Sequence, residues 1–184
     1  KRMKQDKRLN YKKLALAILG VSALALTGCQ HMPFTKQNPA AQARLMNTMN
    51  QAPMGTVSFT PVSSGVLISG TITGLAPNSI HAIHVHENGN CADMGKAAGG
   101  HFNPMSHQHG HPNMTNSHAG ELPNIMANSQ GVATINFINP KISVTNGAAN
   151  SVINRGLIVH AKADDYQSQP AGNAGDRIAC AVIR

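Results

Sequence analysis

The chain has 184 residues, of which 15 are lysine or arginine and 7 are aspartate or glutamate, giving a formal net charge of +8. This charge is unevenly placed, because seven of the basic residues lie between Lys1 and Lys13. Without residues 1–29, eight basic and six acidic residues remain, a net charge of about +2. With so few positive charges and only 3% aromatic residues, the chain offers neither a phosphate-binding stripe nor a base-stacking platform. The composition therefore argues against a nucleic-acid-binding protein.

The first 29 residues have the organisation of an export signal. An apolar run from Leu14 to Leu26 follows the basic segment and ends in Leu26-Thr27-Gly28-Cys29. A basic region, a short apolar region and small residues before a cleavage point are typical of a secretory signal. The alternatives are a transmembrane anchor or a buried helix, but a membrane span needs about 20 apolar residues. The last four residues resemble the bacterial lipobox, in which the cysteine is lipidated.

We therefore expect residues 1–29 to be a lipoprotein signal, with Cys29 as the lipidation site and membrane anchor. This places the protein in the periplasm or cell envelope. Gln30 after the lipidated cysteine is compatible with sorting to the outer membrane, by resemblance to bacterial lipoproteins.

Residues 30–42 are polar and contain two prolines, so we predict a tether here. Residues 43–184 have the length of one domain. Their pattern predicts an all-β fold, because short alternating or β-branched segments are separated by Gly, Pro and Asn. About eight antiparallel strands in a sandwich or Greek-key barrel are expected. The predicted strands cover residues 44–48, 56–60, 66–73, 80–86, 132–138, 142–145, 157–161 and 179–183.

The cysteines favour an oxidising compartment. If Cys29 is lipidated, Cys91 and Cys180 remain as one candidate disulfide. Two buried free thiols are the alternative, which export disfavours.

The long segment between Glu87 and Gln130 has little strand pattern, and a loop of this length usually has a function. Eight of the ten histidines lie between His81 and His118. Alternation along a strand puts His84 and His86 on the same face. Imidazoles suit copper and zinc, and the absence of a cysteine cluster argues against a zinc finger or an iron–sulfur site. The spacing predicts a histidine-rich metal site, but a metal-sequestering tract stays open and no reaction is selected.

Five segments resemble motifs of the copper/zinc superoxide dismutase family, in the family's order, from about Gly55 to the C-terminus. They are His84–Cys91, Gly99–Pro104, His118–Pro123, Val159–Asp165 and Gly172–Cys180. The short gap between His86 and Cys91 resembles bacterial members. The resemblance implies a β-sandwich enzyme that binds copper and zinc ions and converts superoxide to oxygen and hydrogen peroxide.

The resemblance also implies a role for each motif residue. His101 would bridge the two metals and take part in catalysis, and Arg177 would attract the anionic substrate. Asp164 would link the two sites by hydrogen bonds to His84 and His109, and Cys91 would pair with Cys180. The implied ligands are His84, His86, His101 and His160 for copper, and His101, His109, His118 and Glu121 for zinc.

Some features depart from the family or stay open. Glu121 stands where the family has aspartate, so the zinc ligand set is the least secure prediction. Asp176 could weaken the field of Arg177, and His107 and His111 match no family role. A copper- or zinc-binding or copper-delivery protein with little turnover is therefore the alternative function. The family contains both monomers and dimers, so a homodimer also stays open.

Overall fold

A computed structural model describes residues 40–184, and the predicted signal, Cys29 and nearly all of the predicted tether lie outside this range. The described chain forms nine strands and one short 3₁₀ helix, η1 (Lys96–Ala98). None of its helices is long and apolar enough to cross a membrane. The strands are β1 (Ala41–Asn47), β2 (Pro53–Val62), β3 (Gly65–Ile72), β4 (Ile80–His81), β5 (Ile83–His86), β6 (Ile125–Met126), β7 (Ala133–Asn139), β8 (Gly156–His160) and β9 (Arg177–Val182).

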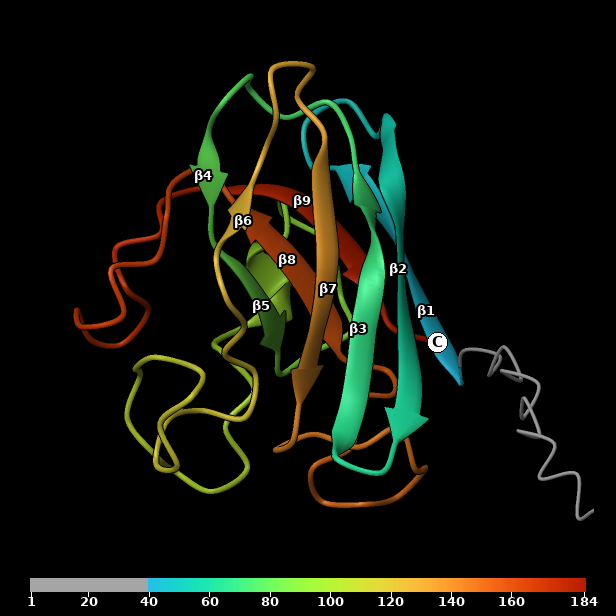
Figure 1. The fold of residues 1–184 in the computed structure, drawn as a ribbon, viewed down its shortest axis with the longest axis vertical. Helices are drawn as coiled ribbons and strands as arrows, with labels where there is room; N and C mark the ends of the chain where they lie inside the picture. The colour runs from blue at the N-terminus through green and yellow to red at the C-terminus, as the bar shows by residue number, and fades with distance from the viewer. Residues whose placement is uncertain (1–39) are drawn as a thin grey trace, which may run out of the picture. The chain divides into compact units, whose positions relative to one another are not determined.

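Seven of these strands make one antiparallel sheet in the order β5-β8-β9-β1-β2-β3-β7, and β4 pairs with β6 (Figure 1). The all-β prediction is confirmed. Strand β5 lies at one edge of the large sheet and joins β8 rather than its sequence neighbours. This crossover brings together two histidine-bearing strands whose paired residues are 70 or more positions apart in sequence.

The observed strands differ from the predicted ones in their ends and in the unpredicted short strand β6, and three differences matter most. The first begins at Ala41, two residues before the predicted start of the domain. The predicted strand over residues 80–86 is divided at Ala82, whose backbone instead bonds Lys162 and His160. The predicted strand over residues 142–145 is wrong: Ser143 makes a single bridge to Ser151, and a turn follows at Thr145.

One face of the large sheet packs against the hydrophobic core. Val57 and Phe59 in β2, and Ile68 and Ile72 in β3, are fully buried, as strand alternation requires. Apolar burial of this kind contributes about 25 cal/mol per Å² and is the main stabilising term of such a domain.

Strands β5 and β8 differ, because every residue in them is buried. Ile83 and Val85 pack into the core, whereas His84 and His86 point to the opposite face. In Figure 1 that side carries two long loops, which follow β5 and β8 in the chain. A second small cluster of Ala98, Ile158 and Cys180 packs beneath the first loop, with Cys91 against it.

The predicted disulfide is confirmed. Cys91 in the loop after β5 is bonded to Cys180 in β9, across 89 residues of sequence. In the chain-entropy model a bridge over such a loop stabilises the fold by about 4 kcal/mol. It also fastens η1 and its loop to the strand that begins at Arg177.

Candidate metal centre

The sheet and the loop after β5 bring the candidate ligands together. Strand β5 supplies His84 and His86, and the adjacent strand β8 supplies His160. The loop returns to β5 twice as isolated β-bridges, where His101 pairs with His86 and Glu121 pairs with His84. Backbone pairing therefore places these two loop residues over the outer face of β5.

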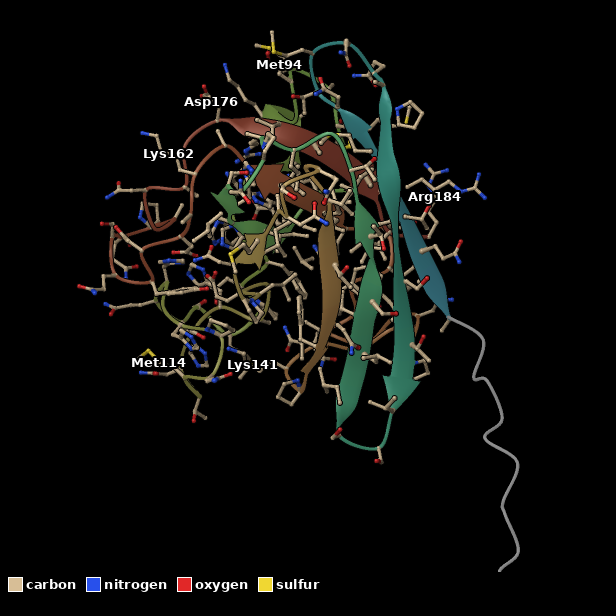
Figure 2. All side chains as sticks on the ribbon, turned by 45° about the horizontal axis from the view of Figure 1, so that its top comes forward. Met94, Met114, Lys141, Lys162, Asp176 and Arg184 are labelled. Atoms are coloured by element: carbon tan, nitrogen blue, oxygen red, sulfur yellow. A yellow bond between two sulfur atoms is a disulfide. The ribbon has the colours of Figure 1, made fainter. Side chains whose placement is uncertain are left out.

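Two groups of four ligand-type side chains result. Within each group the candidate ligand atoms lie within 4.8 Å of one another, and His101 belongs to both. The first group, here called the four-histidine cluster, is His84, His86, His101 and His160. The second, here called the glutamate cluster, is His101, His109, His118 and Glu121. Figure 2 shows the side chains of the two loops that follow β5 and β8, in which Met114 and Lys162 are labelled.

In the four-histidine cluster, backbone acceptors determine which nitrogen carries the proton. Nδ1 of His86 lies 2.9 Å from the carbonyl of Gly99, and Nδ1 of His160 lies 3.2 Å from that of Gly175. A carbonyl can only accept, so in each ring Nδ1 is the donor and Nε2 keeps its lone pair. The two Nε2 atoms face each other at 3.3 Å. Two facing lone pairs repel unless a cation lies between them.

The glutamate cluster is organised around one carboxylate oxygen. Oε1 of Glu121 lies 3.1 Å from Nδ1 of His101, 2.8 Å from Nδ1 of His109 and 2.6 Å from Nδ1 of His118. The Glu121 side chain is fully buried. It therefore points into the cluster and not to solvent, despite being one methylene longer than the family's aspartate.

The carboxylate of Asp164 links the two clusters. Its Oδ2 accepts from Nε2 of His84 at 2.8 Å, and its Oδ1 accepts from Nε2 of His109 at 2.9 Å. These bonds leave Nδ1 of each ring free to point into its cluster. Such an acceptor fixes the tautomer and the direction of a ligand ring. Asp164 therefore hydrogen-bonds one histidine of each cluster.

Burial lowers the pKa of some cluster histidines, whereas neighbouring carboxylates raise that of another. Burial lowers the pKa of His101 to about 4, outweighing the opposite effect of the nearby Glu121 carboxylate. Burial, with neighbouring His84, lowers the pKa of His160 to about 3. Burial also opposes charge on His109, but its bonds to Asp164 and Glu121 outweigh this and raise the pKa to about 9. For Glu121, burial favours the neutral acid, yet the surrounding histidines hold the pKa far below its usual range. Within the glutamate cluster, positive charge is therefore favoured at His109, next to the ionised Glu121 carboxylate.

Four buried polar atoms test whether metals fit this arrangement. Nδ1 of His84, Nε2 of His101 and Oε2 of Glu121 have no hydrogen-bond partner among the described residues, and Nδ1 of His118 lies 2.6 Å from Oε1 of Glu121 without the geometry of a hydrogen bond. A buried polar atom left without a partner costs about 1–3 kcal/mol, so four together are unusual. All four belong to the two clusters, and imidazole with carboxylate is a donor set that suits copper and zinc. The residues present fit these metals.

Arg177 stands beside the four-histidine cluster. Its Nη2 donates to the carbonyl of Gly99 at 2.6 Å, and its Nη1 donates to that of Gly95 at 2.6 Å. The Gly99 carbonyl is also the acceptor for His86, so the guanidinium and a cluster histidine share one atom. The side chain is half-buried, and burial lowers its pKa, although an arginine keeps its charge.

The other loop histidines stay outside both clusters. Nδ1 of His107 lies 3.3 Å from the carbonyl of Ser117, and the His111 ring packs against Tyr166 at 4.6 Å between centroids. The sequence motifs gave no role to His81, whose Nδ1 bonds the carbonyl of His160 at 2.8 Å. Its place shortly before the paired histidines of β5 is weak evidence for such a contact.

Comparisons with known proteins agree with this geometry. Residues 53–183 match the family model described as copper/zinc superoxide dismutase. "Superoxide dismutase [Cu-Zn] 2" of Aquifex aeolicus is 42% identical over 80% of this chain and 88% of its own length. The "Superoxide dismutase [Cu-Zn]" of Deinococcus radiodurans is 33% identical over 95% of this chain and 98% of its own. A crystal structure of a SOD-like protein from Bacillus subtilis superposes with a TM-score of 0.70 at 30% identity, covering 77% of this chain and 96% of that one.

The chain therefore belongs to the copper/zinc superoxide dismutase family. The predicted family, enzyme class and metals, copper and zinc, are confirmed at this level.

Proposed function

We propose that this protein converts superoxide to oxygen and hydrogen peroxide, using copper in the four-histidine cluster and zinc in the glutamate cluster. The observation that carries the proposal is His101, which belongs to both clusters: its Nδ1 faces Glu121, and its Nε2 is buried without a hydrogen-bond partner among the described residues. Copper, when bound, would supply the one-electron chemistry that takes an electron from one superoxide and gives it to the next. Two superoxide ions and two protons then yield one oxygen and one hydrogen peroxide.

The chain's own residues would handle the proton and the anion. His101 has its Nδ1 3.1 Å from Glu121, while its Nε2 is buried without a hydrogen-bond partner among residues 40–184. Nε2 is therefore the atom at which a proton could be held and passed to the reduced product. A nitrogen in such a position acts as a general acid when its pKa suits the reaction.

Arg177 would bind the substrate by charge. Its guanidinium is held by two loop carbonyls at 2.6 Å, so its position next to the four-histidine cluster is fixed. A fixed positive charge at a partly buried site concentrates small anions and accelerates their encounter; superoxide dismutase is a known example of such focusing. Asp176 is exposed and adjacent in sequence, and it would reduce this attraction.

The test combines metal analysis with a superoxide-consumption assay on the purified protein. We expect one copper and one zinc per chain and rapid superoxide consumption that requires copper. Bound metal without turnover would instead support the alternative of a metal-binding or copper-delivery protein.

The zinc assignment is tested at Glu121. Glu121→Gln keeps the shape of the side chain but removes the charge that faces three imidazole nitrogens. We expect zinc to bind at least about tenfold more weakly, because zinc prefers an anionic carboxylate oxygen to a neutral amide. Glu121→Asp serves as the charge-conserving control and should lose less. Equal zinc affinity in Glu121→Gln and the parent would remove Glu121 from the ligand set.

We further propose that the domain acts at the cell envelope, anchored by a lipid on Cys29. The support is the basic and apolar leader before Leu26-Thr27-Gly28-Cys29. Cys29→Ser should move the protein from the membrane fraction to the soluble fraction after cell lysis. A membrane fraction unchanged by this substitution would contradict the anchor.

A further inference from the structure

The loop between β8 and β9 holds one candidate zinc ligand by its backbone. In the side chain of Gln169, Oε1 accepts from the backbone N–H of His109 at 2.9 Å, and Nε2 donates to the His109 carbonyl at 2.8 Å. The two residues are 60 positions apart in sequence. One carboxamide thus hydrogen-bonds both the backbone N–H and the backbone carbonyl of His109, as a residue in a neighbouring strand would.

In the described part of the chain, His109 lacks the pairing to a strand that most of the other candidate ligands have. Both backbone hydrogen bonds of His109 within residues 40–184 are made with Gln169. By contrast, His84 and His86 lie in the β5–β8 ladder, and His101 and Glu121 are bridged to β5. The segment that carries His109 is rich in Gly, Pro and Asn, whose backbone is adaptable.

Asp164 and Gln169 constrain different parts of the same ligand. The bond from Nε2 of His109 to Oδ1 of Asp164 sets the direction of the ring. It does not set the position of the Cα atom, which moves with the backbone. A ligand atom that is displaced by a fraction of an ångström weakens a metal site, because zinc–nitrogen distances are confined near roughly 2.0–2.1 Å.

We propose that Gln169 is a positioning residue for zinc binding: its carboxamide holds the His109 backbone where Nδ1 can reach the glutamate cluster. The inference rests on the proposed zinc site and adds to it a residue from the loop between β8 and β9. It assigns the zinc affinity of the protein partly to a side chain that touches no metal.

Gln167 supplies a matched control in the same loop. It is exposed, as Gln169 is, but only its backbone atoms make hydrogen bonds among the described residues. Replacing either glutamine by alanine removes the same atoms from the same loop. A difference between the two variants therefore reports the hydrogen bonds of the Gln169 carboxamide, which are the two to His109 and a longer one of 3.4 Å to the Gln167 carbonyl.

The experiment measures the affinity of the full domain for Zn²⁺ by competition with a chromophoric chelator, and its affinity for copper in parallel. Gln169→Ala should bind zinc about tenfold more weakly than the parent, the lower end of the effect of removing a group that supports a ligand. Gln167→Ala should match the parent, and all three proteins should bind copper equally, because Gln169 contacts none of the four-histidine cluster. Gln169→Leu, which keeps the bulk of the side chain, should repeat the loss.

The outcomes separate the inference from the function on which it rests. Equal zinc affinity in the Gln169→Ala, Gln169→Leu and Gln167→Ala variants would overturn the positioning role. A parallel loss of zinc and copper affinity would overturn it too, since that pattern indicates general loosening of the fold. A parent protein that binds no zinc would overturn the proposed zinc site itself, and the positioning role with it.

Discussion

The backbone of Gly172 approaches the metal centre closely, and this contact gives the sharpest structural prediction. A Cβ atom built on Gly172 would lie 1.8 Å from Oδ1 of Asp164 and 2.7 Å from Nε2 of His109. To reach even the shortest tolerated contact of 3.0 Å, the loop or the carboxylate must move by roughly 1.2 Å. Gly172 also has a φ of 65°, in the left-handed region that disfavours other residues.

Gly147 separates the two effects, because its φ is 80° and a Cβ atom added there would have nothing within 4 Å. Gly147→Ala should therefore cost only the backbone term, about 1 kcal/mol in the free energy of unfolding. Gly172→Ala has that cost and also disturbs the Oδ1 atom that bonds His109 and the Tyr166 backbone. Losing one or two charge-assisted bonds adds about 2–4 kcal/mol.

Urea unfolding of the metal-free proteins measures this difference, with zinc and copper affinities as a second readout. We expect Gly172→Ala to be less stable than Gly147→Ala by at least about 2 kcal/mol, and to bind zinc roughly tenfold to a hundredfold more weakly. Identical unfolding midpoints and metal affinities in the two variants would refute the reasoning, since the contact with Asp164 would then have no energetic role.

Two further predictions concern charge. Arg177→Ala should keep its copper, because Arg177 is no ligand, but it should lose most of its activity and most of the dependence of activity on ionic strength. Arg177→Lys should keep part of both properties. Loss of copper in Arg177→Ala would contradict this role. The metal-free protein should be most stable near pH ~6.5. In the unfolded chain a histidine has a pKa of about 6.5, whereas in the folded protein His101 and His160 have pKa values of about 4 and about 3. As the pH falls below about 6.5, the unfolded chain therefore binds protons that the folded protein does not, and the folded state loses stability. Each of these histidines then removes up to about 1.4 kcal/mol per pH unit. As the pH rises from about 6.5 towards the folded pKa of about 9, the stabilisation from protonated His109 is lost instead. Denaturant unfolding between about pH 4 and about pH 9 would show this maximum, and a steady rise of stability with falling pH would contradict it.

Local pattern was enough to predict the fold class and two of the residues in the four-histidine cluster. Alternation put His84 and His86 on one face, and the observed strand β5 does so because successive side chains point to opposite faces. The predicted strand over residues 142–145 failed because a β-branched run becomes a strand only when a partner lies beside it, and Ser143 has one bridge. The division at Ala82 was equally invisible, since it depends on backbone bonds to Lys162 and His160.

Motif resemblance extended the prediction to the ligands, to Asp164 and to the pairing of Cys91 with Cys180. It could not decide how Glu121 is oriented, because the answer depends on where the backbone of residue 121 lies. The bridge to His84 and the bonds from the Asn139 side chain to the carbonyls of Ala119 and Glu121 hold that backbone in place. The longer side chain then reaches all three imidazole nitrogens from a buried position.

The sequence by itself determined the residue types, their alternation on strands and the family to which they belong. The tertiary structure decided which lone pairs face each other, which atoms stay without partners and which loop side chain holds His109. These properties arise from contacts between residues far apart in sequence, such as the 74 positions between His86 and His160 and the 60 between His109 and Gln169. Local propensity carries no information about such pairs, because a hydrogen bond or a shared lone-pair site exists only once sheet pairing and loop packing bring both partners within about 3 Å.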